Sequence, residues 1–184
     1  MIIKYIFVYI TGELNPNEKS IMKVVTSFLI CTLFALSIAG SAMALEMGEL
    51  DTSFGTDGLV STRIGHFEDQ AYALTVQPDG RILVAGSSSN GANLDFALVR
   101  YNEDGKLDGT FNIDGTVTTQ VGRGDDGIAA VAVQDDGYII AAGYSVTNGS
   151  KDFALARYTP EGQLDYSFGQ GGLVVTSYGS MDDE

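Results

Sequence analysis

The residues of this chain that could do chemistry are mostly carboxylates, which recur along the sequence. The stretch "DGTFNIDG" places oxygen ligands at Asp108, Asn112 and Asp114, and it superficially resembles a calcium-binding loop. A loop of the EF-hand type needs ligands at alternate positions and a closing Glu, but the closing position counted from Thr110 is Val121. These three residues are therefore weak candidates for calcium. The simpler interpretation is that such Asp side chains cap their own turns.

Other kinds of catalytic or metal chemistry find little support. His66 is the only histidine, so a Ser-His-Asp arrangement has a single candidate base, in the loop "GHFED". The only cysteine, Cys31, lies in an apolar run near the N-terminus, which leaves zinc without its usual ligands. The sequence contains no phosphate-binding loop and no GxSxG motif. We therefore expect no catalytic residue and no bound cofactor.

The charge balance argues against a nucleic-acid partner. The 184 residues include 10 basic and 24 acidic side chains, a formal net charge of −14. A chain this acidic repels the phosphate backbone, which binding proteins contact with Lys and Arg. The 23 glycines point to many tight turns.

The apolar run near the N-terminus has the parts of a secretory leader. Residues 22–44 begin with Met22-Lys23, continue with an apolar stretch over 24–39, and end in the small-x-small site Ala42-Met43-Ala44. The apolar stretch is a little short for a membrane span, and a retained membrane anchor is the alternative. A signal peptide over 22–44 predicts an exported protein, in the periplasm, at the cell surface or outside the cell, with no membrane attachment after cleavage.

Residues 1–21 fit this scheme poorly, because they place a short apolar run and a polar stretch ahead of a complete leader. We interpret residues 1–21 as a mis-called upstream extension and expect translation to start at Met22. The mature chain would then be residues 45–184.

The mature region is built from an internal repeat. The motif "LDTSFGTDGLV" recurs as "LDGTFNIDGTV" and "LDYSFGQGGLV", and the three copies start at Leu50, Leu107 and Leu164. The interval is 57 residues both times (107 − 50 and 164 − 107). When residues 50–106 are set over 107–163, 25 of 57 positions are identical, which establishes two full units and a partial third over 164–184.

Each unit predicts four short strands joined by turns, with no helical periodicity. In the first unit we expect strands at residues 58–64, 71–77, 81–87 and 95–101. The turn Pro78-Asp79-Gly80 would join the second strand to the third. This order predicts a four-stranded antiparallel meander.

Both faces of the predicted sheet are apolar. In the strand 95–101, alternate residues point to opposite faces, and neither set is predominantly polar. Such a sheet must be covered on both sides, and repeated sheets that cover one another predict the blades of an all-β propeller. From Leu50 the 135 residues hold about 2.4 units (135/57), an incomplete ring. A β-sandwich is the alternative fold.

Three motifs together give a family resemblance. "LDxSFGxxG", "QPDGRILVAG" and "DFALVRYNEDGKLD" recur in order over residues 48–184, and they resemble the delta-60 repeat family of bacterial secreted proteins. The resemblance implies a β-propeller in an exported protein, commonly with more units than this chain holds. It implies no activity. Departures from the pattern include Asn112 in place of the Gly of "SFG" and Gly171 in place of the Asp of "xDG".

Several side chains recur in each unit and are expected to be structural. They are the phenylalanines Phe54, Phe111 and Phe168, and the Asp and Arg residues Asp95, Arg100, Asp152 and Arg157. We expect each Arg to pair with a carboxylate of its own or the adjacent unit, in a partly buried pair.

The sequence favours a non-catalytic exported scaffold that binds a protein or ligand. Its contacts would come from loops 87–94 and 144–151, where the two units differ most. One alternative is a part of a propeller hydrolase or lyase whose active site lies in missing blades. Another is a calcium-stabilised adhesive module. Open blade faces would need either further blades or self-assembly to cover them.

Overall fold

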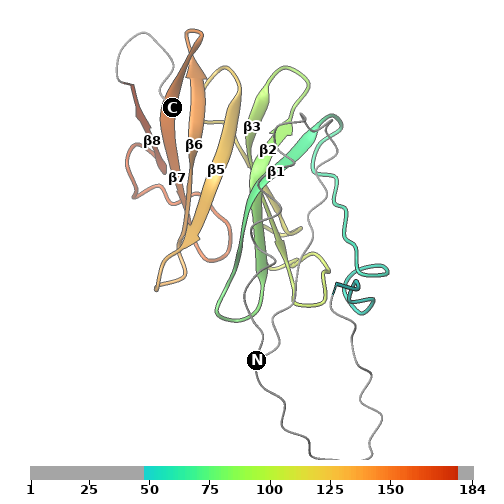
Figure 1. Cartoon of the computed structure of the whole chain (residues 1–184). Coiled ribbons are helices and arrows are strands. Elements are labelled where there is room, and N and C mark those ends of the chain that lie inside the picture. The colour runs from blue at the N-terminus through green and yellow to red at the C-terminus, as the bar shows by residue number, and fades with distance from the viewer. Residues whose placement is uncertain (1–47, 178–184) are drawn as a thin grey trace, which may run out of the picture. The chain divides into compact units, whose positions relative to one another are not determined.

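The computed structural model describes residues 48–177, and in this range the chain forms two four-stranded antiparallel sheets (Figure 1). The first sheet has the order β1-β2-β3-β4, with strands Asp69–Val76, Ile82–Ser89, Leu94–Tyr101 and Thr116–Thr119. The second has the order β5-β6-β7-β8, with strands Asp126–Val133, Ile139–Thr147, Ser150–Tyr158 and Leu173–Thr176. The predicted all-β class and the antiparallel meanders are confirmed. The predicted leader and upstream extension lie outside the described residues.

Each sheet takes three strands from one sequence unit and its fourth from the next unit. β4 lies beyond Leu107, where the second unit begins, yet it pairs with β3 of the first. The prediction that residues 58–64 form the first strand of their unit is therefore wrong. In the described part of the chain, residues 58–64 form no strand. Their one β-bridge is isolated and local, between Leu59 and Thr56. The counterpart of this segment in the next unit is β4, which forms by pairing with the preceding strand β3. None of the described strands precedes residues 58–64.

The remaining strands lie near their predicted places, and a bulge shapes the first strand of each sheet. The pairing of β1 with β2 shifts register between Ala71 and Ala73, opposite Gly86. A Cβ built on Gly86 would lie 1.8 Å from the carbonyl oxygen of Gln70. Gly143 faces Gly127 in the same way at 1.9 Å. Glycine is required at both positions because the two backbones approach too closely for any side chain.

The core lies between the two sheets. The inner face of the first sheet presents Leu83, Phe96 and Leu98, each 0 % exposed, to the second sheet. The second sheet contributes Ile139 and the residues of β7 on the same face, namely Ala154, Ala156 and Tyr158. Because neither sheet has a polar face, one covers the other, as the repeat pattern predicts.

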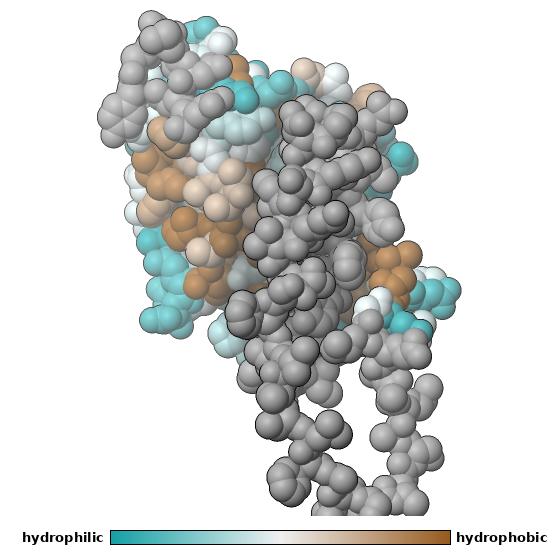
Figure 2. All heavy atoms as spheres, viewed as in Figure 1, coloured by the Kyte–Doolittle hydropathy of each residue, from teal (hydrophilic) through white to brown (hydrophobic). Residues whose placement is uncertain are grey.

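The outer faces of the two sheets carry exposed apolar side chains. On β1, Leu74 and Val76 are 40 % and 56 % exposed, and on the second sheet Phe153 is 46 % exposed. Figure 2 shows apolar residues gathered over the second sheet. Within residues 48–177, no helix is long and apolar enough to cross a membrane.

Candidate binding surfaces

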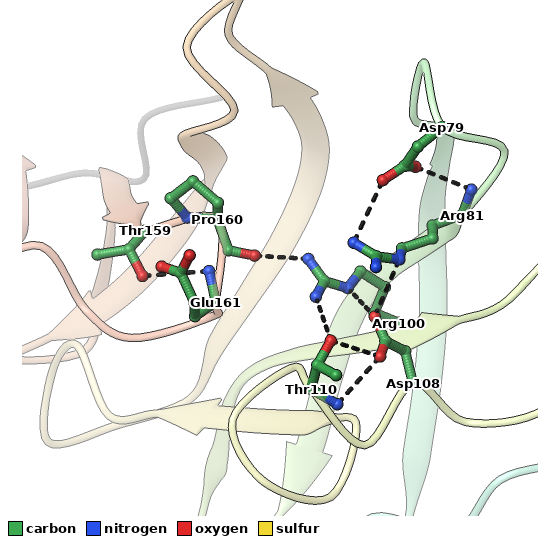
Figure 3. Close-up of polar contacts among 8 residues, drawn as sticks. All are labelled: Asp79, Arg81, Arg100, Asp108, Thr110, Thr159, Pro160 and Glu161. Atoms are coloured by element: carbon green, nitrogen blue, oxygen red, sulfur yellow. Dashed lines mark hydrogen bonds and ion pairs between the residues drawn. The ribbon is translucent and has the colours of Figure 1, made fainter.

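A buried arginine joins the two sheets at the end where β1 turns into β2. Arg100, on β3, has a side chain that is 3 % exposed, and its Nε lies 2.7 Å from Oδ2 of Asp108. Its Nη1 donates to the carbonyl oxygen of Pro160, in the second sequence unit, at 2.5 Å. Its guanidinium also lies over the ring of Phe111, 4.5 Å from the centroid. Figure 3 shows these polar contacts converging on one guanidinium.

Asp108 is the carboxylate that binds this arginine, and we call the contacts of Arg100 and Asp108 between the sheets the joint. Its Oδ1 accepts hydrogen bonds from the backbone N–H and the hydroxyl of Thr110, at 3.0 and 2.6 Å. A second guanidinium, that of Arg81, lies 3.3 Å from Oδ2. Burial raises the pKa of the Asp108 carboxyl, but the hydrogen bonds from Thr110 and the charge of Arg100 outweigh it and hold that pKa below its usual value.

A cleft of about 390 Å³ opens beside the joint, between the β1–β2 turn and the β5–β6 turn. Its walls include Pro78, Asp79 and Arg81 from the first sheet, and Gln134 and Asp135 from the second. Arg81 pairs with Asp79 at 3.2 Å, so its charge is matched within the cleft. The basic groups that line this cleft, Arg81 and Arg100, are thus both paired with carboxylates.

The same turn recurs in all three partial or complete units. Asp51, Asp108 and Asp165 each accept a hydrogen bond at 3.0 Å from the backbone N–H two residues later, in an Asx-type turn. The carboxylate of Asp165 in turn binds Arg157 at 2.6 Å. These Asp residues thus do what the turn-capping interpretation expects of them.

The three weak calcium candidates do not form one ligand set. Asp108 faces Arg100, Asn112 donates its side-chain amide to the carbonyl of Thr116, and Asp114 caps the N–H of Thr116. Among residues 48–177, no group of three or more His, Cys, Asp or Glu side chains could hold a metal ion. A guanidinium 2.7 Å from Asp108 also disfavours a second cation there.

Asp95 and Asp152 recur but do not pair with the arginines of their strands. Asp95 and Arg100 lie five positions apart (100 − 95), so the two side chains leave β3 on opposite faces. Asp95 is 8 % exposed and accepts from the amide of Asn90 at 2.9 Å. One oxygen of Asp95 and one of Asp152 are buried without a hydrogen-bond partner.

Two capping carboxylates were not singled out from the sequence. Asp126 is fully buried and accepts from the backbone N–H groups of Val121 and Gly122, at 2.8 and 2.9 Å. Asp69 holds Ile64 in the same way at 3.0 Å. The signal was present, because Asp69 and Asp126 are identical across the repeat, 57 positions apart (126 − 69).

The predicted binding loops are shorter than expected. β2 runs to Ser89 and β3 starts at Leu94, so the first loop is residues 90–93 and not 87–94. The second is the two-residue turn 148–149 and not 144–151. The loops were placed where the two units differ most, but part of that variable stretch is strand, since Ser87, Ser88 and Ser145 are buried within the ladders.

Hydrogen bonds connect the loops of the two sheets at the end where β2 turns into β3 and β6 turns into β7. The side-chain amide of Asn93 donates to the carbonyl of Gly124 at 2.6 Å, and Leu94 N–H donates to Oδ1 of Asp125 at 2.9 Å. Val146, near the second turn, donates to the carbonyl of Asp125 at 2.9 Å. We call residues 90–93, 122–125 and 146–149 the loop surface.

The repeated sheets define a protein built from propeller-type blades. Two segments, residues 77–111 and 134–168, match the model of a domain of unknown function, the DUF5122 β-propeller. The matches start 57 residues apart (134 − 77), the repeat interval, and each runs from one sequence unit into the start of the next. The comparison with curated proteins gives no match. Together with the two repeated four-stranded sheets, these matches support a fold of β-propeller type.

Proposed function

We propose that the chain is an exported, non-catalytic scaffold that binds a protein or polar ligand through the loop surface. The observation that supports this most strongly is the pair of contacts from Asn93 and Leu94 to Gly124 and Asp125. These contacts join loops of two blades into one polar surface. Loops held by a rigid sheet scaffold are a common place for binding residues.

The first loop is held in one shape by its own side chains. Oδ1 of Asn90 accepts from the N–H groups of Ala92 and Asn93, at 2.8 and 3.2 Å, and its amide donates to Asn93 at 2.7 Å. A loop already ordered in this way loses little conformational freedom on binding, which favours affinity.

The experiment measures binding of the purified protein to envelope polysaccharides and envelope proteins of the producing cells by surface plasmon resonance. An Asn90→Ala/Asn93→Ala variant is expected to lose binding at least tenfold while keeping its far-ultraviolet circular dichroism. Asp136→Ala, in the β5–β6 turn at the opposite end of the sheets, is the matched control and should bind as wild type does. Equal binding by both variants would overturn the proposal.

Export is supported by the leader-like residues 22–44 and predicts a processed protein. Mass spectrometry of the protein recovered from the cell exterior or periplasm is expected to find an N-terminus near residue 45. A protein recovered only from the cytoplasm with residues 22–44 attached would contradict export.

A further inference from the structure

The outer face of the second sheet repeats a face that is buried in the first sheet. Phe153 and Arg157 are the counterparts, 57 residues on, of Phe96 and Arg100. Phe96 is 0 % exposed beneath the second sheet, whereas Phe153 is 46 % exposed. The side chain of Arg100 is 3 % exposed and that of Arg157 is 26 % exposed. We call this side of the second sheet, with Ile140, Phe153, Leu155 and Arg157, the open face.

The first sheet carries the surface that such a face binds. Val131, Val133 and Ile139 of the second sheet pack against the core that the two sheets share. Their counterparts are Leu74, Val76 and Ile82, on the outer side of the first sheet. We call these three residues and their surroundings the docking face. Leu74 and Val76 are 40 % and 56 % exposed.

Residues 50–62 partly occupy the docking face, as a mimic of a preceding blade. The N–H of Gly55 donates to the carbonyl of Asp104 at 2.8 Å, which repeats the contact of Asn112 with Glu161 between the two sheets. The hydroxyl of Tyr101 donates to Thr62 at 2.8 Å, which repeats the contact of Tyr158 with Thr119 at 2.9 Å.

This mimic is held more weakly than the segment that it resembles. The counterpart of residues 59–62 is β4, which forms a ladder with β3 over four residue pairs. Among the described residues, 59–62 form no ladder with another strand, and their one bridge is local, between Thr56 and Leu59. Residues 50–62 can therefore leave the docking face without breaking a sheet.

We propose that a second copy of this chain binds head to tail, with the open face of one copy on the docking face of the next. Residues 50–62 of the receiving copy are displaced. Gly169 and Thr176 of the incoming copy take the places of Gly55 and Thr62, since each pair lies 114 residues apart (169 − 55 and 176 − 62), two repeat intervals. Continuity with the packing already present between the two sheets makes the second copy the fitting occupant.

Charge supports the same pairing. Arg100 donates to the carbonyl of Pro160, and the counterpart of Pro160 in the docking face is Glu103. Arg157 of the incoming copy would thus meet Glu103, whose carboxylate adds an attraction that Pro160 does not offer. Contact between two different faces is heterologous, so successive copies close a ring when their rotation allows it.

Light scattering of the mature protein over a concentration series tests the inference. Wild type is expected to form oligomers, and Phe153→Lys on the open face or Leu74→Lys on the docking face is expected to give monomers. A mixture of the two variants retains one intact pair of faces and should form a 1:1 dimer. Tyr166→Lys, at a residue 78 % exposed, is the control and should assemble as wild type does.

Two equivalent threonines give a second readout with opposite signs. Thr62→Val removes a hydrogen bond that holds residues 50–62 in place, and should tighten assembly by about fivefold. Thr176→Val removes the acceptor of the incoming copy and should weaken assembly by a similar factor. Both variants keep their circular dichroism in the expected case.

Three outcomes would overturn the inference. A wild type that stays monomeric over the concentration series shows that no second copy binds. Monomers from Phe153→Lys together with unchanged assembly of Leu74→Lys indicate a symmetric contact between open faces. A shift in the same direction for both threonine variants shows that residues 50–62 do not compete for the docking face.

Discussion

At the scale of single residues, the arginine of each unit is the clearest link between sequence and packing. Arg100 neutralises a carboxylate of the adjacent unit and contacts the backbone of the second sheet through Pro160. The sequence predicted a carboxylate partner without identifying it. Asp108 lies in the next unit, beyond a loop, so no pattern within β3 identifies it as the partner.

Replacing Arg100 should destabilise the protein strongly. Arg100→Met leaves the Asp108 carboxylate in a buried site with only the more distant Arg81, and should lower the free energy of unfolding by about 3–5 kcal/mol. Arg157→Met is the matched variant and should cost much less, because that side chain is 26 % exposed. Urea unfolding measures both. Equal losses would show that burial between the sheets does not set the strength of the Arg100 contact.

The buried tyrosine predicts a loss of stability at alkaline pH. Burial raises the pKa of Tyr158 to about 12, against the smaller opposite effect of its hydrogen bond to Thr119. A raised pKa contributes stability that is fully present below the unfolded pKa of about 10, and that is lost as pH rises from there to the folded pKa.

Urea unfolding between pH 8 and pH 12 checks the sign of this effect. Wild type should lose more stability over that range than Tyr158→Phe, whose ring does not ionise. Tyr166→Phe, at a residue 78 % exposed, should follow the wild-type profile and serves as the control. A Tyr158→Phe profile identical to that of wild type would contradict the assignment.

At the scale of elements, local patterns predicted three strands of each sheet and failed for the fourth. β1, β2 and β3 follow one another through tight turns, so their alternation and turn residues are local signals. The sequence of β4 is compatible with two positions. It could be the first strand of its own unit's sheet or the last strand of the preceding sheet. Only the pairing of Thr118 with Ala97 decides between these, and that pairing spans a loop of the next unit.

The bulge glycines should tolerate no side chain. Gly143→Ala puts a Cβ 1.9 Å from the carbonyl of Gly127, which forces β5 and β6 apart. We expect a loss of about 2–3 kcal/mol in the free energy of unfolding, at the upper end for single substitutions. Gly109→Ala is the control, since its nearest neighbour would be 3.7 Å away, and it should change stability little. Thermal unfolding of both variants measures the difference.

At the scale of the whole molecule, the repeat explains both the packing of the sheets and the surfaces left for partners. The sheets cover one another because each unit is apolar on both faces. Each sheet combines strands of two units because the sheet boundary falls inside the sequence unit. The loop surface and the open face both follow from this arrangement. The positions of both surfaces depend on which strand is the fourth of each sheet. The central structural claim is that β4, from the second unit, completes the first sheet by pairing with β3.

A pair of engineered cysteines tests that claim most directly. Ala97 on β3 lies directly opposite Thr118 on β4. Oxidation of the Ala97→Cys/Thr118→Cys variant should therefore form a cross-strand disulfide, detected by mass spectrometry of the linked peptides. The control replaces Ser61, the counterpart of Thr118 one repeat earlier, and Ala97→Cys/Ser61→Cys should stay reduced. Linkage in the Thr118 variant alone is the predicted result. Linkage in the Ser61 variant and none in the Thr118 variant would show that each sheet is closed by a strand of its own unit.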